Sequence, residues 1–112
     1  MTQEEKELLL KDLCARLPYR TKVHIIGEGG VEIDADLTTS TIDYFESWTV
    51  QSYLRPMSSM TENELNEYNK IFNKSLNMWE VVDWMNAHHF DYRGLIEKGL
   101  ALEAPGNMYK TE

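Results

Sequence analysis

The sequence is poor in the features that mark secreted and membrane proteins. It has a single cysteine, Cys14, so no disulfide can form within the chain, which is typical of a reducing compartment. No apolar run approaches the ~20 residues that span a bilayer. The acidic N-terminus, whose apolar run is only Leu8 to Leu10, does not resemble a signal peptide. These absences predict a soluble, cytoplasmic protein with no membrane partner.

Positive charge is also scarce, and the deficit is even along the chain. Residues 1–56 hold 6 basic and 10 acidic side chains and residues 57–112 hold 5 and 9, so each half contributes −4 to a formal net charge of −8. A protein that binds a phosphate backbone needs a basic face, so we expect no nucleic-acid partner. Only a basic patch gathered by folding would change this expectation. Its candidates are Lys11, Arg16, Arg20 and Lys22.

Apolar side chains, at 42 % of the 112 residues, suffice for a core without disulfides or metals. The richest stretch is residues 77–105, which holds Trp79 and Trp84. Large aromatic side chains contribute most of the burial energy of a small domain. We therefore expect a central helix here, with the rest of the chain packed against it. Trp79 or Trp84, or both, should be largely buried with Val82 and Met85.

The N-terminal segment predicts one amphipathic helix. Thr2 and Glu5 form a capping-box pattern, and Pro18 should end the helix near Arg16. The spacing i, i+3, i+4, i+7 predicts the buried face. Its members are Leu10, Leu13, Cys14 and Leu17, while charged residues such as Asp12 should face solvent.

Two strand patterns follow, at residues 21–26 and 31–37, with a glycine-rich turn between them. The register that keeps apolar residues on one face sets Ile25 opposite Ile33 and Val23 opposite Ala35. All four should point inward. On the other face, Lys22 should lie opposite Asp36 and His24 opposite Asp34.

The remaining elements are mostly helical. We expect a third strand within residues 41–50, a helical turn at 50–54 and a connector at 55–60. A capping box of Thr61 and Glu64 should start a helix that runs to about Lys74. Asn77 should cap the next helix, which ends near His88, and Asp91 should cap a short one that ends before Gly99. A last strand is possible at 100–104, and residues 106–112 should form a frayed tail.

These elements predict a single α+β domain over residues 1–105. It consists of an N-terminal helix, a small antiparallel sheet built from the hairpin and a third strand, and two or three C-terminal helices.

No motif for catalysis, a cofactor or a metal is present. Asp34 and Asp36 could begin a calcium loop, but Thr39 and Phe45 occupy the positions of its glycine and glutamate. His88 and His89 are adjacent, which suits a helix end better than a zinc site. Cys14 should be buried and therefore inert as a nucleophile. We expect no enzymatic activity, no cofactor and no metal.

The leading hypothesis is a non-enzymatic accessory protein that binds another protein. Tyr53, Met57 and Met60 flank the stiff Pro56 connector and could form an exposed apolar patch, because methionines adapt to irregular surfaces. Alternatively, these side chains fill the gap between sheet and helices. A second hypothesis is an acidic mimic of nucleic acid that occupies a host protein. A third is a winged-helix-like protein, because residues 95–100, LIEKGL, are similar to a helix-to-wing junction.

Three strings carry a family resemblance: ELLLKDLCARLPY in the first helix, YLRPMSSMTENE at residues 53–64, and DWMNAHHFDYRGLIEKGLALEAP at residues 83–105. They resemble a group of small proteins with no assigned activity from gut Bacteroides and relatives, often encoded in prophage or other mobile-element neighbourhoods. The resemblance implies a bacterial, cytoplasmic and phage-associated setting. It transfers no functional residue to this chain.

The histidine spacing generates one prediction about stability. Thermal melts recorded with zinc and with a chelator should coincide, because too few histidine and cysteine ligands stand at chelating distances in the sequence. A melting temperature that rises with stoichiometric zinc would contradict it.

Overall fold

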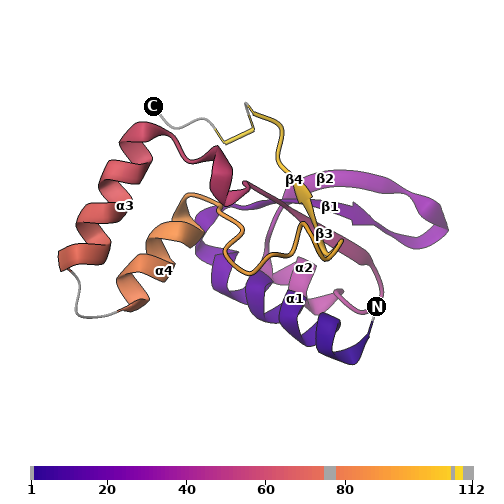
Figure 1. Ribbon diagram of the computed structural model, residues 1–112. Helices are drawn as coiled ribbons and strands as arrows, with labels where there is room; N and C mark the ends of the chain where they lie inside the picture. Colours follow the sequence, from indigo (N-terminus) through magenta and orange to yellow (C-terminus); the bar gives the residue numbers. More distant parts are fainter. Residues whose placement is uncertain (1, 75–77, 107, 110–112) are drawn as a thin grey trace.

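A computed structural model describes residues 2–74, 78–106 and 108–109. It shows a four-stranded mixed sheet with α1 and α2 under one face and a helical hairpin, α3 and α4, to one side (Figure 1). This confirms the predicted α+β class. The helices are α1 (Gln3–Arg16), α2 (Thr39–Asp43), α3 (Glu62–Lys74) and α4 (Met78–Ala87). The strands are β1 (Lys22–Ile26), β2 (Glu32–Asp36), β3 (Thr49–Leu54) and β4 (Ala101–Glu103), and 3-10 turns lie at Leu17–Tyr19, Glu28–Gly30 and Met57–Ser59.

The sheet has the strand order β2-β1-β3-β4, in which β1 is antiparallel to both neighbours and β3 is parallel to β4. The predicted hairpin register is confirmed, with Ile25 opposite Ile33 and His24 opposite Asp34. Val23 and Ile25 are buried as expected, and Ala35 is partly buried. The prediction for Ile33 is wrong, because this side chain is 51 % exposed. Its strand, β2, lies at the edge of the sheet, and among the described residues it has a neighbouring strand on one side only.

The first helix begins with the predicted capping box, in which Glu5 N–H donates to Thr2 Oγ1 at 3.1 Å. Its buried face is shifted by one residue from the prediction. Cys14 is exposed, Leu10 is 38 % exposed and Asp12 is fully buried. The face that packs consists of Leu9, Asp12, Leu13 and Arg16. A buried ion pair, with Arg16 Nε 2.7 Å from Asp12 Oδ2, replaces the apolar residues that periodicity alone would select.

The third strand lies later in the chain than predicted. Of residues 41–50, the first three end α2 and residues 44–48 follow it, while β3 begins at Thr49 and covers the residues expected to make a helical turn. Val50, Ser52 and Leu54 are all buried, which is the period of a strand. Because Val50 and Leu54 are four residues apart, they fit a helix equally well, and small Ser52 between them gave no apolar signal. Its hydroxyl has no hydrogen-bond partner among the described residues.

The C-terminal half follows the predicted order with one change. The capping box of α3 is confirmed, with Thr61 N–H donating to Glu64 Oε1 at 2.9 Å, while the predicted Asn77 cap lies outside the described residues. The segment after Asp91 forms turns instead of a short helix, although Asp91 does accept the Leu95 amide at 2.8 Å. Gly99 ends the segment with the left-handed φ of +75°. No described helix leads into β4, so the predicted helix-to-wing junction is not formed.

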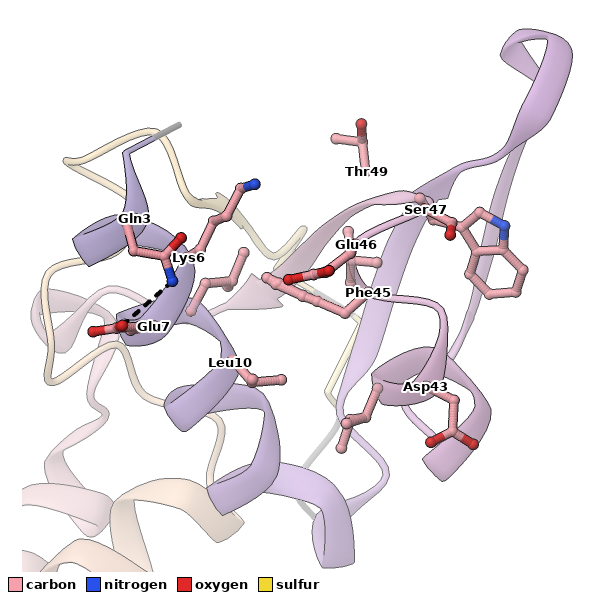
Figure 2. Close-up of a pocket in the computed structure, with 13 residues that line it drawn as sticks. Gln3, Lys6, Glu7, Leu10, Asp43, Phe45, Glu46, Ser47 and Thr49 are labelled. Carbon is pink, nitrogen blue, oxygen red and sulfur yellow. Dashed lines mark hydrogen bonds between the residues drawn. The ribbon is translucent and has the colours of Figure 1, made fainter.

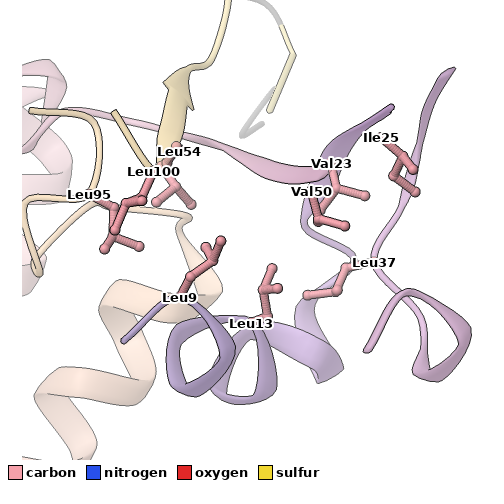
Figure 3. Packing of buried hydrophobic residues seen from close by; sticks show 10 residues of the cluster. Leu9, Leu13, Val23, Ile25, Leu37, Val50, Leu54, Leu95 and Leu100 are labelled. Atoms are coloured by element: carbon pink, nitrogen blue, oxygen red, sulfur yellow. The ribbon is translucent and has the colours of Figure 1, made fainter. Parts of the chain in front are cut away.

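Two hydrophobic clusters make up the core. In the larger one, Leu9 and Leu13 of α1 point toward the apolar face of the sheet (Figure 3). The smaller one joins Val81, Trp84 and Met85 of α4 to Phe90. The stretch 77–105 contributes to both clusters, because Leu95, Leu100 and Ala101 join the larger one, but the helix expected at its centre, α4, belongs to the smaller one. Burial of Trp84 is confirmed at 9 % exposed, with Met85 at 8 % and Val82 partly buried.

In the segment predicted to form a frayed tail, Tyr109 contacts the end of the sheet. The Tyr109 hydroxyl accepts the Lys22 N–H at 2.7 Å and donates to the Tyr53 carbonyl oxygen at 2.7 Å. Its ring stacks on His89 with centroids 3.8 Å apart. Lys22 and Tyr53 lie one position beyond the last paired residues of β1 and β3, Val23 and Ser52. The tyrosine hydroxyl therefore replaces the next backbone hydrogen bond of the sheet.

Two leucines of α1 test the location of the larger core. We expect Leu13→Ala to lower the free energy of unfolding by about 2–5 kcal/mol, because it leaves a cavity where the side chain is fully buried. Leu10→Ala is the matched control, and its partly exposed side chain should cost about 1 kcal/mol or less. Denaturant unfolding measures both values. Equal losses would contradict the observed face of α1.

Candidate functional site

The three residues proposed from the sequence as a binding patch lie in different surroundings. Met60 packs against the cluster of α4 and Phe90, as the packing alternative predicted. Met57 lies in a 3-10 turn and is 38 % exposed. Tyr53 extends across the outer face of the sheet, where its hydroxyl donates to Asp34 Oδ1 at 2.8 Å. Their role in partner binding stays a prediction, and larger exposed apolar side chains lie elsewhere.

Several of them belong to the helical hairpin. Phe72 near the end of α3 is 50 % exposed, and Met78 and Trp79 at the start of α4 are 60 % and 72 % exposed. We call these three residues the hairpin tip, because both helix ends lie at the side of the hairpin farthest from the sheet (Figure 1). Leu65, earlier on α3, is a further exposed apolar residue. The tip therefore presents an aromatic ring, a thioether and an indole on adjacent helix ends.

The base of the hairpin is fixed by a buried carboxylate. The Arg55 guanidinium donates two hydrogen bonds of 2.7 Å to the Glu64 carboxylate and lies 4.3 Å from the centre of the Phe90 ring. These charge-assisted bonds from Arg55 are the main cause that lowers the pKa of Glu64 to about 2. Trp84 Nε1 also donates to Glu67 Oε1 at 2.7 Å, which joins α4 to α3. The hairpin is thus anchored to the end of β3 and held together along its length.

The outer face of the sheet carries an acidic row with basic partners. His24 Nδ1 lies 2.8 Å from Asp34 Oδ1 and its Nε2 lies 2.8 Å from Glu32 Oε1. The hydrogen bonds to Asp34 and then Glu32 raise the pKa of His24. The pKa of Asp34 is lowered in turn by His24 and by the Tyr53 hydroxyl. Asp36, the third carboxylate of the row, pairs with Lys22.

The basic side chains proposed as a possible nucleic-acid patch are not all available for such a role. Arg16 is fully buried on Asp12, and Lys22 is paired with Asp36. Arg93 also pairs with the buried Asp12, with its Nε 3.0 Å from Asp12 Oδ1.

The two adjacent histidines have structural contacts. His89 has a left-handed φ of +64°, and its Nδ1 lies 3.2 Å from Thr21 Oγ1. Burial, with a smaller effect from Arg16, lowers the pKa of His89 to about 4. His88 Nδ1 lies 3.3 Å from Glu64 Oε2. In the part of the chain that the structure describes, no three His, Cys, Asp or Glu side chains are grouped to hold a metal ion.

A cleft of ≈ 580 Å³ lies between α1 and the segment that joins α2 to β3 (Figure 2). Leu9, Leu10 and Phe45 contribute apolar surface, and Glu7 and Glu46 contribute carboxylates. Its described lining contains no histidine or cysteine. The cleft therefore offers space and apolar surface without a histidine or a thiol for proton transfer or nucleophilic attack.

No protein-family model, curated protein or solved structure matches this chain. None of the described helices has the length and apolarity needed to cross a membrane. Function must therefore be inferred from the surfaces of the chain itself.

Sequence reasoning missed the hairpin tip because it assigned these side chains to the core. The sequence signal that could have revealed the tip is the start of α4. There Met78, Trp79, Val81 and Val82 are all apolar, and Glu80 is the one polar residue among them. A helix that is apolar on most sides can bury them all only at the centre of a fold. α4 contacts α3 and, to a smaller extent, α1, and the apolar side chains of Met78 and Trp79 at its start stay exposed.

Two histidines, His24 and His89, predict opposite pH effects. His24 should titrate above 6.5, so its stabilising contribution is present below pH 6.5 and is lost as pH rises through its raised pKa. His89 should titrate near 4, so its contribution is present above pH 6.5 and is lost as pH falls toward 4. Histidine ring NMR titration measures both values. His24→Gln is the control for assignment, and a His24 pKa below 6.5 would contradict the observed pairing.

Proposed function

We propose that this protein is a non-enzymatic, bacterial or phage-associated accessory protein that acts by protein–protein contact through the hairpin tip. The observation that carries the proposal is the exposure of Phe72, Met78 and Trp79 at one end of α3 and α4. Contiguous exposed apolar side chains mark interaction sites in folded proteins. Aromatic residues and methionine are also enriched in protein interfaces, and tryptophan is prominent among the residues that dominate binding energy.

The anchoring of the hairpin supports the same proposal. A surface that is ordered before binding loses less conformational entropy when a partner docks. The Arg55–Glu64 pair and the Trp84–Glu67 hydrogen bond hold the two helices without using the tip. The molecule extends 48 Å along its longest axis and 28 and 24 Å across it, and the hairpin projects beyond the sheet (Figure 1). A partner can therefore approach Phe72, Met78 and Trp79 from the side away from the sheet (Figure 1).

The bacterial, phage-associated and cytoplasmic setting is supported by the resemblance of the three sequence strings.

The acidic-mimic hypothesis has weaker support. Glu32, Asp34 and Asp36 do stand in a row on β2, but His24 and Lys22 pair with them. Carboxylates that are paired within the chain are poor substitutes for the free phosphates of a nucleic acid.

A pair of neighbouring substitutions tests the hairpin tip. Phe72→Asp should lower the free energy of unfolding by only about 1 kcal/mol, because the ring is half exposed and its main loss is the stacking on Tyr68. It should weaken partner binding by about 30-fold or more if Phe72 is a dominant contact. Asn73→Asp adds the same charge at the next exposed position of α3 and should change neither property.

The measurement uses the immobilised full chain and a lysate of the source organism, with bound proteins quantified by mass spectrometry. A photo-crosslinking residue in place of Trp79 should join to the same protein that Phe72→Asp loses. Retention of every bound protein by the Phe72→Asp chain would exclude the tip as the contact surface.

A further inference from the structure

Strand β2 forms an edge of the sheet, and its hydrogen-bonding pattern fixes which backbone groups face outward. Gly27 N–H donates to the Val31 carbonyl and Leu37 N–H donates to the Thr21 carbonyl, both at 2.8 Å. Because paired residues alternate in an antiparallel ladder, Ile33 and Ala35 also face β1. The N–H and C=O groups of Glu32, Asp34 and Asp36 therefore point away from the sheet. Among the described residues, no strand lies beyond them.

The side chains of this edge alternate between two chemical types. Val31 and Ile33 are 62 % and 51 % exposed and point to the helical side of the sheet. The carboxylates of Glu32, Asp34 and Asp36 lie on the opposite side, with side chains 60 %, 59 % and 46 % exposed. Folded proteins usually shorten, cover or charge such an edge because it can pair with another strand. On this edge strand only one face of the sheet carries charged side chains. The apolar side chains on the other face, Val31 and Ile33, are exposed.

An aromatic pair extends the apolar side of the edge. A Cβ atom on Gly27, the residue paired with Val31, would lie 3.9 Å from Trp48 Nε1. The Trp48 ring stacks on Tyr44 with centroids 4.8 Å apart, and Tyr44 is 52 % exposed. Apolar surface thus continues past the end of β2.

We propose that the outer edge of β2 binds an extended segment of another protein, in which basic and apolar side chains alternate, as a fifth strand. Backbone hydrogen bonds to Glu32, Asp34 and Asp36 would hold the segment, as in other cases of strand addition. Its basic side chains would lie beside the three carboxylates, and its apolar side chains would cover Val31 and Ile33. This site is independent of the hairpin tip.

Charge decides against a second copy of this chain as the occupant. In an antiparallel pairing of two β2 edges through their outward groups, the residues that meet are Glu32, Asp34 and Asp36 from each copy. Directly opposed like charges destabilise a strand pair. Lys22 and His24 offset the three carboxylates only in part, and the whole chain carries a formal charge of −8. A basic segment would instead be attracted to the three carboxylates. Its rate of association should fall as the salt concentration rises.

Amide hydrogen exchange of the full chain tests the proposal without a substitution. The probe is a synthetic peptide of about seven residues with alternating lysine and valine, long enough to cover one strand. On binding, exchange of the Glu32, Asp34 and Asp36 amides should slow about tenfold or more, which matches the protection expected for newly bonded amides. The Ile33 and Ala35 amides, already bonded to β1, should change little. A peptide of alternating glutamate and valine should give no protection.

Two substitutions at one position separate backbone pairing from charge. Glu32→Pro removes an outward N–H, and Val31 before it already has the extended φ of −68° and ψ of 127° that proline requires. Glu32→Ala removes the same charge but keeps the N–H. The proline variant should bind the lysine–valine peptide about tenfold more weakly than the alanine variant, the upper range for one hydrogen bond.

Three results would overturn the inference. Peptide binding with no alternating protection along β2 would indicate contact through charge alone. Equal affinities of the Glu32→Pro and Glu32→Ala chains would exclude pairing at this edge. Protection of the same amides in a dimer without peptide, detected by sedimentation, would make a second copy the occupant.

Discussion

The buried Asp12 carboxylate is the contact on which the arrangement of the two cores depends. It lies between Arg16 and Arg93, and Arg16 Nη2 also donates to the Phe90 carbonyl at 2.7 Å. Phe90 belongs to the smaller core and lies against the Arg55 guanidinium that holds Glu64. Charged groups therefore connect α1 to the helical hairpin. Removing one member of such a buried set leaves an uncompensated charge, which typically costs ~3–5 kcal/mol.

Local chemistry explains what could be predicted from the sequence. The hairpin register follows from strict alternation over residues 31–37, because a shift by one residue would expose every buried side chain. The capping boxes at Thr2 and Thr61 and the left-handed Gly99 also depend on residues within one turn. Each of these features was confirmed because its partners are close in sequence.

The errors come from partners that are distant in sequence. Asp12 is buried because Arg93, 81 residues away, reaches it, and no periodicity in the first helix reveals that contact. Phe72, Met78 and Trp79 have the composition of a core, and only the position of α3 and α4 beside the sheet leaves them exposed. Ile33 lies opposite an apolar residue of β1, but its side chain stays exposed because β2 is at the edge of the sheet. Which strand forms the edge depends on the strand order of the whole sheet and not on the local sequence. Apolar composition therefore identified the side chains that form the candidate surfaces. It could not show which of these side chains are exposed and which belong to the core.

Tyr109 has a consequence for the order in which this sheet is completed during synthesis. Lys22 and Tyr53 leave the ribosome well before residue 109, since translation adds residues one at a time at ~5–20 per second. Until Tyr109 arrives, the Lys22 N–H and the Tyr53 carbonyl at this end of β1 and β3 lack the hydroxyl that joins them. The nascent chain can form most of its sheet early, but the last link between these two strands is a side chain made among the final residues described.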